Sequence, residues 1–189
     1  DISAGNVLAS QTYYGAYRYL DDADLTGSLS ELGNVTTSGD PNHRIDHSGL
    51  VPAVDSRIVK VEIYRGTAGQ QTTLYLITTT GNKGTITTTA DNGSGFCRFT
   101  AAATHYLSVN SIVQVSGHSQ AAINVAHVVT AVDAAAKTFD TDQAFAGSGT
   151  AAWDISGFQN DDTSDTVTQA LEALPILNED DTLFARQYT

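Results

Sequence analysis

The chain has 189 residues, enough for one domain with a sizeable core or for two small domains. Acidic residues number 21 against 9 basic ones, which gives a net charge of -12. Because affinity for nucleic acid comes mostly from Lys and Arg side chains that neutralise phosphates, we expect no nucleic-acid partner. No apolar run approaches the ~20 residues needed to span a bilayer, so we expect a soluble protein with no membrane partner.

The cysteine and glycine content further narrows the possible fold classes. Cys97 is the only cysteine, so it forms no intrachain disulfide and belongs to no cysteine cluster for zinc. We expect its thiol to lie in the core, between Phe96 and Phe99. The chain holds 16 Gly against 3 Pro and is rich in Thr, which is typical of extended strands joined by tight turns.

Residues 1–20 are predicted to form an arm or a first strand, and they carry a cluster of tyrosines. Tyr17 and Tyr19 share one face of a strand, because successive side chains point to opposite faces. A tyrosine offers an apolar ring with a polar tip, which suits stacking on a sugar or on a partner subunit. The candidate ligand-binding residues are Tyr13, Tyr14, Tyr17 and Tyr19. The alternative is a half-buried strand or a subunit contact.

Residues 21–33 are expected to form one short helix or a turn-rich loop. Asp21, Asp22 and Asp24 have a spacing that suits calcium binding through carboxylate oxygens, but the rest of an EF-hand loop is missing. These three residues are the candidate calcium ligands, and calcium is the one cofactor that the sequence suggests. The alternative is an acidic loop in solvent.

Residues 34–56 are predicted to form a long, turn-rich connection. His43 and His47 are four residues apart, a zinc-binding spacing on a helix, but the neighbouring Pro and Gly argue against a helix. Asp46, His47 and Ser48 are the residue types of a catalytic triad, yet neighbours in sequence cannot adopt its geometry. Long loops of this kind often contact neighbouring subunits.

Residues 57–89 carry a strong strand pattern. Lys60, Glu62 and Tyr64 alternate with Val59, Val61 and Ile63, which predicts one apolar face and one mostly polar face. Residues 74–79 alternate in a similar way. A turn at residues 81–84 then leads into residues 85–89, which predicts a hairpin.

Residues 95–153 hold short apolar bursts separated by Gly, Ser, Asn and Asp. The bursts, at 112–115, 125–132 and 139–145, are rich in β-branched and aromatic side chains, which predicts a small barrel or sandwich. The sequence on either side looks different. We therefore interpret 95–153 as a small β-barrel module inserted into an anchoring β domain made of residues 1–90 and 155–189.

This module also resembles a known family. The likeness rests on a threonine opening, a His-x-Leu step, a V-x-V-S-G strand and a V-x-x-V-D…T-F close, carried by Thr100, His105, Leu107, Val113–Gly117, Val129–Asp133, Thr138 and Phe139. It is similar to a β module of tail-fibre, spike and other virion proteins of tailed bacteriophages, and to the barrel that flanks the catalytic cysteine of ubiquitin-activating enzymes. Asn110-Ser111 stands where the family usually carries Gly-Asp. The family is structural, so the resemblance implies no active site.

The C-terminal region is predicted to contain the one short helix. Between Ser164 and Leu174, apolar residues fall at helical spacing, and Pro175 follows them. Residues 182–186 are predicted to form a final strand.

The predicted fold is mainly β: an antiparallel sandwich or barrel domain with one short helix, plus the inserted small barrel. No nucleophile and base occur in a recognisable context, so we expect no enzyme activity. We expect a non-enzymatic structural component of a virus particle, a phage head decoration or a tail or fibre protein. It would assemble through its discontinuous domain and project the module.

The expected partners are other copies of the chain (a trimer by analogy), other virion proteins and a host-surface glycan. Two alternative functions stay open at this point. One is a carbohydrate or cell-surface binding module, and the other is a subunit of an extracellular filament assembled by strand exchange. The expected location is the virion, or else a secreted or cell-surface position.

Overall fold

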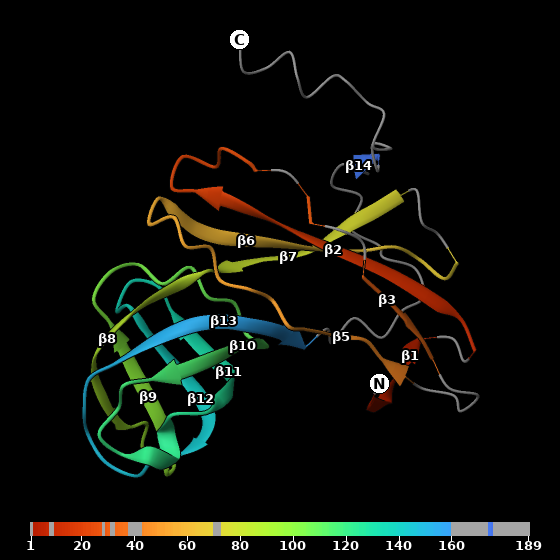
Figure 1. Ribbon diagram of the computed structural model, residues 1–189. Helices are drawn as coiled ribbons and strands as arrows, with labels where there is room; N and C mark the ends of the chain where they lie inside the picture. Colours follow the sequence, from red (N-terminus) through yellow and green to blue (C-terminus); the bar gives the residue numbers. More distant parts are fainter. Residues whose placement is uncertain are drawn as a thin grey trace.

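The computed structural model consists of antiparallel sheets (Figure 1). It describes residues 2–7, 10–27, 29–30, 33–37, 43–69, 73–159 and 174–175. Within these ranges the one helical element is η1 (Ala121–Ile123), a single 3-10 turn. This confirms the predicted mainly β class. The described residues contain no helix with the length and apolarity that crossing a bilayer requires.

One sheet closes on itself as a barrel. Its strands are β8 (Lys83–Asp91), β9 (Phe96–Ala101), β10 (Ser111–Ser116), β11 (Ala126–Asp133), β12 (Thr138–Ala144) and β13 (Ala151–Gln159). They run in the order β10-β11-β12-β9-β8-β13, and β13 pairs again with β10, so the ring is complete. Closure leaves no strand edge inside the ring, which removes the usual template for unwanted pairing.

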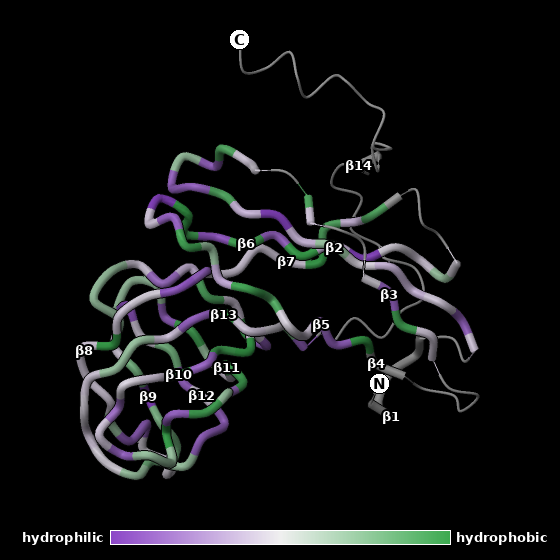
Figure 2. Tube along the Cα trace, in the orientation of Figure 1, coloured by the Kyte–Doolittle hydropathy of each residue, from purple (hydrophilic) through white to green (hydrophobic). Residues whose placement is uncertain are grey.

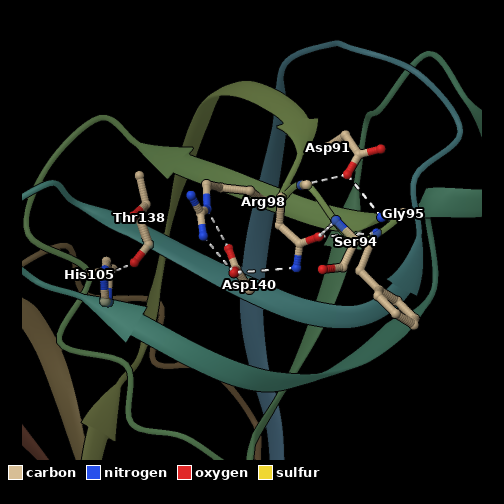
Figure 3. Close-up of polar contacts among 10 residues, drawn as sticks. Asp91, Ser94, Gly95, Arg98, His105, Thr138 and Asp140 are labelled. Atoms are coloured by element: carbon tan, nitrogen blue, oxygen red, sulfur yellow. Dashed lines mark hydrogen bonds and ion pairs between the residues drawn. The ribbon is translucent and has the colours of Figure 1, made fainter.

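Strands β10, β11 and β12 lie where the apolar bursts predict them. The ring, however, takes in β8 and all of β13, so it reaches beyond residues 95–153 on both sides. The interpretation of 95–153 as an inserted module stays a prediction. The stretch from Asp91 to Gly95, at the start of the predicted module, is a tight turn between β8 and β9. Figure 3 shows the Asp91 carboxylate accepting hydrogen bonds from the amides of Gly93 (2.7 Å) and Gly95 (3.0 Å).

The barrel interior is filled by aromatic and aliphatic side chains. Along β10, buried and partly buried residues alternate, so every second side chain of this strand points inward. Figure 2 shows hydrophobic and hydrophilic positions interspersed along the barrel strands. The ring of Phe139 lies 5.3 Å from that of Phe99 and 6.0 Å from that of Trp153, measured between centroids. Cys97 is fully buried in this cluster, which confirms its prediction as a core residue.

The second sheet is open and has five strands. In order across the sheet they are β14 (Leu174–Pro175), β7 (Thr73–Gly81), β6 (Ile58–Arg65), β2 (Thr12–Asp21) and β3 (Gly33–Thr36). Val61 and Ile63 of β6 pack with Leu50, Ile155 and Phe158, in a cluster that links this sheet to the last strand of the barrel.

The other face of β6 is less polar than the alternation predicts. Tyr64 is buried there, packed with Ala16 and Leu74, and Glu62 is only 9 % exposed. Glu62 tolerates this position because it is paired with Arg18 and accepts a hydrogen bond from the Tyr64 hydroxyl at 2.5 Å. Burying a charged group needs such partners.

Short strands lie within the connection over residues 34–56 that the sequence predicts to be turn-rich. β1 (Ile2–Val7) and β4 (His43–Arg44) pair as a two-stranded sheet. β5 (Asp46–Ser48) pairs with the end of β13. In Figure 1, β5 lies between the barrel and the open sheet.

The predicted hairpin over residues 81–84 is wrong. β7 pairs with β6 and β14, whereas β8 pairs with β9 and β13, so the chain crosses from the open sheet to the barrel at Asn82. The Asn82 side chain accepts from the amide of Ala53 and donates to the carbonyl of Ile58, both at 3.0 Å. Its backbone bonds to Val59 and Ile155. Asn82 therefore forms hydrogen bonds to strands of both sheets and links them.

The predicted helix from Ser164 lies outside the described residues, except for Leu174, which belongs to strand β14. The predicted strand over 182–186 also lies outside them. In the loop after β2, the described part of residues 21–33 forms turns and an isolated bridge between Leu20 and Thr26, in agreement with the turn-rich alternative.

Candidate binding pocket

A pocket of about 450 Å³ lies between the open sheet and the segment 45–50 that passes over it. Its wall comes from β2, β3, β5 and the end of β6, through Tyr13, Tyr14, Gly15, Ala16, Tyr17, Ser30, Gly33, Asn34, Val35, Ile45, Asp46, His47, Ser48, Leu50 and Arg65. Gly33, Asn34 and Ser48 are exposed at the rim, while Tyr13, Ile45 and Arg65 are buried. The volume is in the range of small-molecule sites.

Three of the four tyrosines predicted to bind a ligand line this pocket. Tyr13 and Tyr17 occupy one face of β2, and Tyr14 the other. Tyr13 is only 1 % exposed and packs against Ile45, whereas Tyr14 and Tyr17 are half-buried. Tyr19 lies farther along the strand, where its hydroxyl donates to the carbonyl of Val51. Burial there raises the pKa of Tyr19 to about 12.

His47 lies against the open sheet at Gly15, which leaves room for its ring. A Cβ atom at position 15 would lie 3.0 Å from Cε1 of His47, so the ring fits because Gly15 has no side chain. The Nε2 atom of His47 is buried and has no hydrogen-bond partner among the residues that the structure describes. Burial, and next the charge of Arg65, lower the pKa of His47 to about 4, against the opposite pull of Asp46.

Arg65 is a pocket residue that sequence reasoning misses. It lies at the end of β6, and its side chain is fully buried. The guanidinium carbon lies 5.7 Å from the centre of the Tyr13 ring, a cation–π distance. The sequence signal that could have identified Arg65 is its position in the strand pattern. Arg65 follows Val61 and Ile63 on the face that alternation makes apolar, where a charged residue is unexpected.

The three predicted calcium ligands point to three different partners. Asp21 accepts from the amides of Ala23 (2.9 Å) and Leu25 (2.8 Å). Asp22 accepts from the Tyr106 hydroxyl at 2.6 Å, and Asp24 pairs with Lys60 at 2.5 Å. Within the described ranges, no three His, Cys, Asp or Glu residues are grouped for a metal ion. Calcium at this loop stays a prediction.

The buried titratable groups of the barrel serve its packing. Burial raises the pKa of the Cys97 thiol, which makes it a poor nucleophile at neutral pH. Burial lowers the pKa of His105 and of His127, which favours the neutral form of both rings. The ion pair drawn in Figure 3 joins Arg98 to Asp140 at 2.7 Å, across β9 and β12, and it holds the pKa of Asp140 below its usual range.

Comparison of the chain with protein-family models, with curated proteins and with solved structures gives no match.

Proposed function

We propose that the chain is a non-enzymatic structural subunit of a virus particle, a head decoration or a tail or fibre protein. The observation that carries the proposal is the contrast between the two main sheets. The barrel has closed its own edges, whereas the five-stranded sheet is open. An open edge is a ready template for pairing with another chain. Copies would then assemble through the open sheet and project the barrel away from the contact.

The proposed contact edge is β3. Among the described strands it pairs with β2 alone. The amide of Thr37 donates to Gln11, so residues 11 and 37 form a hydrogen-bonded pair, and alternation along the register places the amides of Asn34 and Thr36 on the outer side. The strand is mostly exposed.

The test is the mass of the purified chain in solution by light scattering. We expect a closed oligomer for the wild type, and dissociation for Thr36→Pro, which removes an outward amide while leaving the β2 ladder intact. Thr36→Ala is the matched control, because both variants lose the hydroxyl contact with Thr12 and only proline loses the amide. A wild-type chain that stays monomeric at all concentrations, with calcium and with chelator, contradicts the proposal.

The two alternatives keep their own tests. A filament subunit that exchanges its N-terminal arm would grow without limit, and removal of the arm would block that growth. A carbohydrate-binding module would bind a glycan, and Tyr→Ala changes at Tyr14 or Tyr17 would abolish binding without unfolding the chain.

A further inference from the structure

The β8–β9 turn contains an asparagine that is followed directly by a glycine. Asn92 is the only asparagine in the chain with this neighbour. In such a pair the amide nitrogen of the second residue can attack the asparagine side chain, because glycine has no side chain to shield that nitrogen. Gly93 is exposed and has a φ of 93°, and a Cβ atom there would meet nothing within 4 Å, so the described part of the chain does not shield it either.

The reaction that this pair makes possible is a deamidation. The nitrogen of Gly93 gives up its proton to water and forms a bond to Cγ of Asn92. The bond from Cγ to Nδ2 breaks, and Nδ2 takes up a proton and leaves as ammonia. Water then opens the resulting succinimide ring at one of its carbonyl groups, which yields either aspartate or isoaspartate.

In the folded turn the attacking nitrogen is engaged by Asp91. The Gly93 amide donates to Oδ1 of Asp91 at 2.7 Å, and the same oxygen accepts from the amide of Gly95 at 3.0 Å (Figure 3). Hydrogen bonds to a charged acceptor are among the stronger ones in proteins. The Gly93 amide must give up this bond before its nitrogen can lose a proton and attack, so Asp91 opposes the first step.

The side chain under attack is also held in place. Its Oδ1 accepts from the amides of Ser94 (2.9 Å) and Phe96 (3.4 Å), an arrangement typical of asparagine in a turn. Its Nδ2 donates to Oδ2 of Asp140 at 3.4 Å. A carboxamide held at both ends does not rotate freely toward the backbone nitrogen, and bond formation needs the two atoms in a narrow range of geometries. The turn therefore has to open locally before the reaction can proceed.

We propose that Asn92 is a deamidation site whose reaction the folded turn slows, and that Asp91 sets the rate. The product places a second carboxylate against Asp140, which already pairs with Arg98 across β9 and β12. Like charges at this distance repel, so the reaction weakens the barrel at the β8–β9 hairpin. The proposal does not depend on assembly through β3, because the turn belongs to the closed barrel.

The test is peptide mapping by mass spectrometry after incubation of the full chain at pH 7.5, in buffer and in guanidinium chloride. We expect Asn92 to lose ammonia before any other asparagine in denaturant, and to react at least about tenfold more slowly in buffer, where the turn is folded. The reacted chain, refolded and separated by ion exchange, should unfold at a lower urea concentration than the unreacted chain. Equal rates in the two solvents, earlier reaction of another asparagine, or an unchanged urea midpoint of the reacted chain would overturn the proposal.

Variants at position 91 separate the role of Asp91 from general stability. Asp91→Ala removes the acceptor and should speed the reaction in buffer about tenfold, the effect of one charge-assisted hydrogen bond. Asp91→Asn keeps an Oδ1 acceptor and should react more slowly than Asp91→Ala. The matched control is Asp133→Ala in the β11–β12 turn, where the Asp133 carboxylate accepts from the amide of Ala136 at 2.9 Å. This control should leave the rate at Asn92 unchanged.

In denaturant all these chains should react at similar rates, because the turn is absent. Circular dichroism checks that each variant is folded in buffer. A folded Asp91→Ala that reacts at the wild-type rate, or an equal acceleration by Asp133→Ala, would contradict the role of Asp91.

Discussion

Two buried histidines of the barrel make hydrogen bonds that protonation of their rings would disturb. Nδ1 of His105 accepts from the amide of Leu107 at 3.0 Å, so its Nε2 carries the proton and donates to the carbonyl of Thr138 at 3.2 Å (Figure 3). A second proton on this ring would face the Leu107 amide, donor against donor. His127 donates from Nε2 to the carbonyl of Ile123 at 2.7 Å inside the same core.

We expect the free energy of unfolding to fall as the pH drops below about 6.5, the usual pKa of histidine. Burial lowers the pKa of His105 and His127, so between the unfolded and folded pKa values the unfolded chain binds protons that the folded chain does not. His47 adds to this loss until the pH reaches its pKa of about 4. Urea unfolding at pH 7.5 and at pH 5 measures the effect.

The matched variant for this pH dependence is His127→Gln. Glutamine can keep a hydrogen bond to Ile123 but does not titrate, so the variant should lose less stability between the two pH values than the wild type does. A urea midpoint that is the same at both pH values would contradict the assignment.

Two glycines in strands of the open sheet give a second test at the residue scale. A Cβ atom at Gly81 would lie 1.9 Å from the carbonyl oxygen of His105, a backbone atom that cannot move aside. Gly81→Ala should therefore cost about 3 kcal/mol or more. The control is Gly33→Ala, where the nearest atom would be 3.9 Å away, and it should change stability by less than about 1 kcal/mol. Equal losses measured by urea unfolding would show that the close approach is absent.

Strands β10, β11 and β12 of the barrel were predictable, because each is short, rich in β-branched or aromatic residues and followed by turn residues. The junction at Asn82 was not. Residues 81–84 have the chemistry of a hairpin turn, but Asn82 bonds to Ala53 and Ile58 far away in the sequence, and these contacts place the next strand in another sheet. For the pocket, the tyrosine cluster of β2 predicted one wall. The place of His47 depends on how β5 lies over β2, which no local pattern encodes.

At the scale of elements, Phe139 holds three strands of the barrel together. Its ring contacts those of Phe99 and Trp153, which lie on β9 and β13. Phe139→Ala should lower the free energy of unfolding by about 3–5 kcal/mol, because it leaves a cavity in a closed core. Trp153 is the only tryptophan and is buried, so its fluorescence follows the barrel directly.

Phe96→Ala serves as the control for this prediction. Phe96 lies on β9 like Phe99, but it is 43 % exposed, so its removal should cost much less. If both variants unfold at the same urea concentration, Phe139 is not a core residue.

At the scale of the whole molecule, strand β13 belongs to two cores. Trp153 packs inside the barrel, whereas Ile155 and Phe158 pack with Val61 and Ile63 of the open sheet. The loop residue Tyr106 adds a second link, since its hydroxyl binds Asp22 beyond the end of β2. Because one strand serves both cores, the barrel and the open sheet should unfold together.

Asn82→Ala tests this coupling. The variant leaves the amide of Ala53 and the carbonyl of Ile58 without their partner in a buried site, so we expect a loss of about 2–3 kcal/mol in the free energy of unfolding.

In the wild type, the unfolding transitions followed by Trp153 fluorescence and by far-ultraviolet circular dichroism should coincide. In Asn82→Ala the dichroism should change first, because the open sheet loses its fastening while the barrel keeps its own ring of strands. Asn92→Ala, in the β8–β9 turn of the barrel, should instead shift both signals equally. Separate transitions in the wild type would mean that the two sheets are stable independently and that Asn82 joins them without coupling them.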